Sequence, residues 1–135
     1  MSVFGKAIRT YLTGQTGYAA TIPGGISPEI APAGSTLPFV VYTGSEDTPV
    51  LRLDGTTVAR QASVNLVVTA ETRSECESVT AFLRTNLEQG TWAGLTNPKI
   101  YFWRVVSQSD VSEVILDGSD ESIRLVNLQV DGAYI

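Results

Sequence analysis

The side chains that could carry chemistry in this sequence are mainly carboxylates near its C-terminal end. Asp117, Asp120 and Glu121 offer the oxygen ligands that a hard cation prefers. They lack the regular alternation of a calcium-binding loop, and the glycine and serine among them are ordinary turn formers. Acid–base catalysis by two carboxylates remains conceivable, but no pattern selects one pair. We therefore interpret this cluster as a solvated turn and expect no metal site.

Nucleophilic catalysis is constrained by one cysteine and by a complete lack of histidine. Cys76 falls on the apolar stripe of a predicted helix, which favours a small buried hydrophobic residue over a reactive thiol. Without histidine, Ser-His-Asp and Cys-His catalysis and the commonest zinc ligand sets are excluded. An enzyme is thus the weaker interpretation, and a structural or interaction protein is the stronger one.

Net charge and chain length further restrict the class of protein. The chain has 135 residues and a net charge of −5, with nine basic against 14 acidic side chains. Its arginines are scattered singly, so attraction to nucleic acid through phosphate neutralisation is not expected. The length predicts one domain over residues 1–135. The longest apolar run, Leu37 to Tyr42, is too short to cross a membrane, and no signal peptide is evident. We expect synthesis in a cytoplasm, with the product remaining there or in an assembled particle.

A predicted strand followed directly by a predicted helix runs from Val58 to Gly90, and the other elements are expected to pack around this unit. Its first half alternates in the period of a half-buried antiparallel strand. Thr72 and Glu75 then have the spacing of a capping box, and Gly90 stands where a C-terminal cap is expected. The predicted apolar faces of this strand and helix are formed by Val58, Ala62, Val64, Leu66, Val68 and Ala70, and by Cys76, Val79, Leu83 and Leu87.

The remaining elements are placed around this strand–helix unit. We expect a first amphipathic helix over Val3 to Leu12, then an ordered, extended segment from Thr21 to Pro38 with a short strand near Gly25 to Pro28. Further strands are predicted over 39–44, 99–107 and 123–130. Both faces of the 99–107 strand are apolar, so we expect a helix or a neighbouring subunit to cover each face.

Two segments between these elements are expected to be loops. Residues 45–50 form a predicted loop, and Asp54-Gly55 is a hairpin-turn dipeptide, so residues 45–57 should project as a flap or arm. An interaction role and a solvated turn without a partner are both open for this arm. Residues 109–121 form an acidic loop, and Trp92 is expected to anchor the loop that follows Gly90.

The order of these features resembles the tail-completion (tail-terminator, or tail-to-head joining) proteins of long-tailed bacteriophages. The resemblance begins with the N-terminal helix and continues through Ile26-Ser27-Pro28-Glu29-Ile30-Ala31-Pro32 and Leu37-Pro38-Phe39-Val40-Val41-Tyr42. Asp54-Gly55, the strand 62–70, the helix 74–87 and the final strand complete it. These motifs are strand and turn spacings, and they cover nearly the whole chain.

The resemblance implies an α+β fold, a mostly antiparallel sheet with two α-helices packed on one face. It also implies a virion protein without cofactor or catalytic residue, assembled as a homo-oligomeric ring, usually of six copies, that stops tube growth and joins the tail tube to the head connector. DNA would pass through the lumen without specific binding. The open alternatives are another neck or tube ring protein (a head-completion protein or tail-tube subunit) and a small acidic ligand-binding or hydrolase domain.

Two sets of residues are assigned to this assembly. An exposed sheet edge can be completed by a neighbour, and acidic loops facing the lumen would repel DNA phosphates. Residues predicted to contact a subunit or the tube are Glu46, Asp47, Thr48, Leu51, Arg52, Asp54, Tyr101 and Trp103. Residues predicted to face the lumen are Asp110, Asp117, Asp120 and Glu121.

Overall fold

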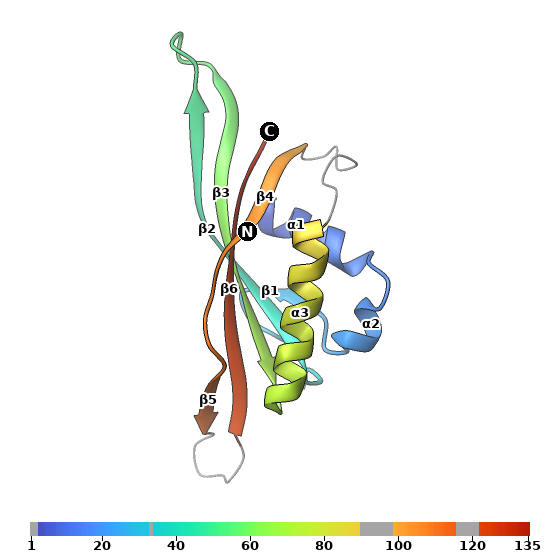
Figure 1. The fold of residues 1–135 in the computed structure, drawn as a ribbon. Coiled ribbons are helices and arrows are strands. Elements are labelled where there is room, and N and C mark those ends of the chain that lie inside the picture. The colour runs from blue at the N-terminus through green and yellow to red at the C-terminus, as the bar shows by residue number, and fades with distance from the viewer. Residues whose placement is uncertain (1–2, 33, 90–98, 116–121) are drawn as a thin grey trace.

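The computed structural model describes residues 3–32, 34–89, 99–115 and 122–135. Along the chain, two helices come first, and a third helix near the centre is preceded and followed by strands (Figure 1). The helices are α1 (Val3–Thr13), α2 (Tyr18–Thr21) and α3 (Arg73–Gln89). The strands are β1 (Ile26–Pro28), β2 (Phe39–Leu51), β3 (Thr57–Ala70), β4 (Ile100–Gln108), β5 (Ser112–Ile115) and β6 (Ser122–Tyr134).

The strands form one sheet in the order β1-β2-β3-β6-β4, with β5 paired to β6. β1 and β2 run parallel, and the other pairs among these strands are antiparallel. β3 lies between β2 and β6, as expected for the strand on which the chain is organised. The prediction of a mostly antiparallel α+β fold is therefore confirmed.

The buried face of β3 follows the predicted alternation. Val64, Leu66 and Val68 are at most 1% exposed, because every second side chain of a strand points to the same face. These side chains belong to one core that includes Phe4 and Ile8 of α1, and Figure 1 shows the helices on one side of the sheet. The predicted outline of two helices is incomplete, because the short α2 adds a third.

Helix α3 begins where the capping spacing predicts. The backbone N–H of Glu75 donates to the Thr72 hydroxyl at 3.2 Å, which satisfies one of the helix's unpaired first-turn donors. The apolar stripe of α3 is buried throughout, with Cys76, Val79, Leu83 and Leu87 each at most 1% exposed. The interpretation of Cys76 as a buried hydrophobic residue is confirmed, and burial also raises the pKa of its thiol. The predicted Gly90 cap and the Trp92 anchor lie outside the described residues.

Several element boundaries differ from the sequence prediction. β2 continues seven residues past the predicted end at Gly44, so the predicted loop over residues 45–50 is wrong. The acidic segment contains the strand β5, and β6 extends past the predicted end at residue 130 to Tyr134, which is buried. Within the described residues, no helix is long and apolar enough to cross a membrane.

Candidate interaction site

The arm predicted between residues 45 and 57 is a β-hairpin that continues the sheet. Pairing between β2 and β3 shifts register between Gly44 and Asp47 and then resumes from Asp47 opposite Ala62. The extra residue on β2 is a bulge, which bends a strand and increases its twist. Figure 1 shows the end of this hairpin standing beyond the rest of the sheet. Backbone pairing, rather than loop composition, thus positions the predicted interface residues.

The tip of the arm is a tight turn stabilised by its own hydrogen bonds. The backbone N–H of Arg52 donates to the Thr56 carbonyl at 2.8 Å, and Gly55 has a φ of 87°, a conformation that glycine adopts readily. The Thr56 hydroxyl and its backbone N–H donate to Asp54 Oδ1 at 2.6 and 2.9 Å. These bonds lower the pKa of Asp54. The predicted hairpin turn at Asp54-Gly55 is confirmed.

The arm exposes apolar side chains that no part of the described chain covers. Leu53 is fully exposed, Leu51 is 57% exposed and Val50 is 39% exposed. The side chains of Thr48, Arg52 and Asp54 are exposed beside them. Four of the predicted interface residues (Thr48, Leu51, Arg52 and Asp54) are therefore brought together on one projection. The backbone of Glu46 and Asp47 lies at its base, and their side chains lie outside what the structure describes.

The two predicted interface residues of β4 have different surroundings. Tyr101 is 42% exposed, with Lys99 Nζ 5.7 Å from its ring centre. Trp103 is 3% exposed. Its indole Nε1 donates to the Leu87 carbonyl at 2.8 Å, and its ring packs edge-on against Tyr11. Trp103 is therefore part of the core beneath α3, and its predicted place at an interface is wrong.

A bulge explains why strict alternation fails in β4. The register to β6 shifts between Ile100 and Phe102, so Ile100 and Trp103 are both buried although they are an odd number of residues apart. Phe102 is left 41% exposed on the other side. Within the described chain only one face of this strand is covered, since Phe102 and Val106 remain exposed, and the predicted cover of the other face by a neighbouring subunit stays a prediction.

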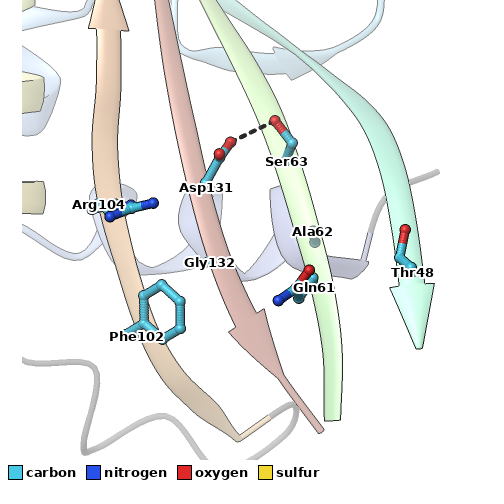
Figure 2. Close-up of a pocket in the computed structure, with 8 residues that line it drawn as sticks. All are labelled: Thr48, Gln61, Ala62, Ser63, Phe102, Arg104, Asp131 and Gly132. Atoms are coloured by element: carbon cyan, nitrogen blue, oxygen red, sulfur yellow. Dashed lines mark hydrogen bonds between the residues drawn. The ribbon is translucent and has the colours of Figure 1, made fainter. Parts of the chain in front are cut away.

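A shallow hollow of about 240 Å³ lies where β4, β6 and the base of the arm meet. Figure 2 shows Phe102 and Arg104 of β4 leaning toward β6, with Gln61 and Ser63 of β3 beyond it. The lining consists of Thr48, Gln61, Ala62, Ser63, Phe102, Arg104, Asp131 and Gly132. The sequence patterns did not indicate this site. The available signal was Arg104, a charged residue that directly follows Trp103 in a largely apolar strand and so lies on the opposite face.

Polar groups on one side of the hollow are held in place by a small network. The Ser63 hydroxyl donates to Asp131 Oδ1 at 2.7 Å, and Gln129 Nε2 donates to the same oxygen at 3.2 Å. Arg104 is the cross-strand neighbour of Asp131, and its side chain is exposed. The hollow therefore presents one cation, one carboxylate and an aromatic ring, a combination suited to binding a side chain.

The predicted lumen residues are only partly described. Asp110 is exposed just before β5, and β5 is paired to β6 with an ion pair of 3.6 Å between Arg124 and Glu113. Asp117, Asp120 and Glu121 lie outside the described residues. No group of three or more metal-ligating side chains occurs in the ranges that the structure describes.

The structure describes a small α+β protein with an exposed arm and a shallow hollow on its surface. A family model described as "Tail completion protein gp17" matches residues 6–117. The chain therefore belongs to the tail completion protein family, and it is a structural protein of bacteriophage tails. No curated protein sequence matches it.

The fold is also similar to that of a chain in the solved structure "Virion of native gene transfer agent (GTA) particle". That chain is 11% identical, with a TM-score of 0.60 over 96% of this chain and 92% of its own. At this identity the similarity concerns the fold.

Proposed function

We propose that this protein forms a ring at the head-proximal end of the tail tube, where it ends tube growth and joins the tail to the head connector. Its partners are further copies of itself, six in the proposed ring, together with the tube protein and a connector protein. The protein acts through binding, without catalysis or cofactor. Membership in the tail completion family supports this role.

The observation that carries the ring proposal is the presence of two different exposed surfaces on one chain. The arm carries Leu51 and Leu53, whereas Phe102 and Arg104 lie on β4, at the opposite edge of the sheet from β2. Two unlike surfaces that bind each other form a heterologous contact, which generates a closed ring when the rotation between copies closes.

Removing the arm tests this function. Deletion of Asp47 to Asp54 should give folded monomers, because none of the described side chains in this segment belongs to the core. Particles made with this variant should have abnormal or unjoined tails. Native mass spectrometry reports the oligomer, and imaging of particles with the labelled protein reports its position. The matched control is Ile30→Ala, which removes an apolar side chain that is 81% exposed outside the arm. Normal rings from the deletion variant would contradict the proposal.

The position of the label separates this function from the nearest alternative. A terminator would occur once, at the head-proximal end of the tube, whereas a tube subunit would label the whole tail and a head-completion protein would label the head. A bound metal or small ligand on a monomer would instead favour a ligand-binding domain.

We further propose that acidic side chains line the lumen of this ring and repel DNA phosphates during passage. The candidates are Asp110, Asp117, Asp120 and Glu121, with Glu46 and Asp47 at the base of the arm. Neutralising Glu46, Asp47, Asp117 and Asp120 with the corresponding amides should slow DNA ejection and lower infectivity. Unchanged ejection and infectivity would contradict this part of the proposal.

A further inference from the structure

We propose that the arm tip of one copy docks into the hollow of the next copy. Leu53 would lie against Phe102, while Asp54 and Arg52 would pair with Arg104 and Asp131 respectively. This inference rests on the proposed ring, and it identifies the contact that joins the copies.

The shape and polarity of the hollow indicate which kind of segment can bind in it. Leu53 has no contact that hides it from water, and burying a leucine side chain stabilises a contact. The hollow, at about 240 Å³, is smaller than the roughly 300–1,000 Å³ of ordinary small-molecule pockets. Its exposed aromatic ring, Phe102, offers an apolar surface for one or two side chains. A hairpin tip with one protruding leucine fits these dimensions.

Charge complementarity selects a second copy of this chain. The tip carries Arg52 and Asp54 on either side of Leu53, and the hollow carries Arg104 and Asp131 as cross-strand neighbours. Each surface has one cation and one anion, so two ion pairs can form with no charge left over. Thr56 donates to Asp54 through Oδ1, and Ser63 and Gln129 donate to Asp131 through Oδ1, so an arginine can approach Oδ2 of either carboxylate.

The tip cannot reach the hollow of its own chain. Thr48 lines the hollow, and the strand from Thr48 to the tip leads away from it by roughly 3.3 Å per residue. β2 continues for three residues from Thr48 to its end at Leu51, which corresponds to about 10 Å, and Leu53 lies beyond that end. The contact must therefore form between chains, and every copy supplies one tip and one hollow.

Pairing between sheet edges explains the assembly less well. In the arm, β2 has β3 on one side, but Pro49 lacks the N–H that a new strand would need. At the opposite edge, the pairing of β4 with β6 is interrupted by register shifts at Ile100/Phe102 and Val105/Ser107. Prolines and bulges are devices that discourage edge-to-edge pairing. The exposed side chains, rather than the edges, carry the complementarity.

The first experiment uses complementation between two defective full-length variants. Leu53→Asp disables the tip, and Phe102→Asp disables the hollow, with Arg104→Glu as a second hollow variant if Phe102→Asp does not fold. Each variant alone should associate at least tenfold more weakly than the wild type. An equimolar mixture should form 1:1 dimers and nothing larger, because it contains one intact tip and one intact hollow. Ile30→Asp and Val114→Asp, 81% and 40% exposed outside both surfaces, should assemble like the wild type.

The second experiment traps the contact and does not depend on its strength. Under mild oxidation at increasing protein concentration, the double variant Leu53→Cys/Phe102→Cys should give a ladder of multimers. The two single variants mixed together should stop at a dimer. The native Cys76 is fully buried and serves as the internal background in the wild type.

The outcomes separate this inference from the proposed function. Wild-type assembly by Leu53→Asp, or no ladder from the double cysteine variant beyond that of the single variants, would overturn the tip-in-hollow contact while leaving the ring possible. Absence of the labelled protein from tail ends would overturn the proposed function instead. Dimers in the mixture and a ladder from the double variant together support the inference.

Discussion

The helix-covered half of the sheet and the arm are built from the same two strands, β2 and β3, but their surroundings differ. In the covered half, Val64, Leu66 and Val68 of β3 are packed under the helices. In the arm, every side chain from Thr48 to Thr57 is exposed. An isolated two-stranded hairpin is only marginally stable, so the arm persists because it is continuous with the sheet. The helix-covered half therefore supplies the stability of the fold, and the arm supplies the exposed side chains on which the proposed contacts depend.

The strongest test of this division compares two leucines. Leu83 in α3 is 0% exposed, whereas Leu53 at the tip is fully exposed. Leu83→Ala should lower the free energy of unfolding by about 2–5 kcal/mol, because it removes buried contacts and leaves a cavity. Leu53→Ala should change it by no more than about 0.5 kcal/mol. Urea unfolding followed by circular dichroism measures both. Similar losses would mean that the arm is buried and that the division is wrong.

A smaller effect is expected where the two regions meet, at Gly132. This residue lines the hollow, and a Cβ added to it would clash with the backbone carbonyl oxygen of Phe102 and stand 2.5 Å from Cζ of Phe4 in α1. Gly132→Ala should lower the free energy of unfolding by about 1–3 kcal/mol, as overpacking does. Gly14→Ala is the matched control, since its added Cβ would lie 3.6 Å from the Tyr11 carbonyl oxygen, an ordinary van der Waals distance. Equal stability of the two variants would show that both the Phe102 backbone and the Phe4 ring shift without cost.

The smallest effect concerns the turn of the arm and depends on pH. Hydrogen bonds from Thr56 lower the pKa of Asp54 below its ordinary value of 3.8. The folded turn thus favours the carboxylate, and its contribution is present above pH 3.8 and is lost as the pH falls through the lowered pKa. An NMR titration of the Asp54 carboxyl should give a midpoint below 3.8. Thr56→Val should move it upward, and Thr57→Val should not. A midpoint at 3.8 in the wild type would contradict the turn geometry.

Local patterns predicted the strand–helix unit well because each half follows a simple period. The alternation over residues 62–70 and the spacing of Thr72 and Glu75 correspond to β3 and to the start of α3. These patterns work because burial on one face selects side chains every two residues in a strand and every three or four in a helix.

The failures occur where pairing overrides local composition. Residues 45–50 look like a loop, yet the bulge after Gly44 lets β2 resume pairing with β3 as far as Leu51. In β4, one bulge transfers Trp103 to the buried face and leaves Phe102 exposed. A register shift depends on the partner strand. The sequence around either position therefore does not show where the bulge occurs.

By itself, the sequence determined the α+β class, the buried faces of β3 and α3, the turn at Asp54-Gly55, and the resemblance that the family match bears out. These features depend on neighbours within a few residues. Only the tertiary structure decided that Phe102, Arg104, Asp131 and Gln61 share one hollow at the base of the arm. That juxtaposition joins three strands from distant parts of the chain, and it arises from the register of β6 between β3 and β4.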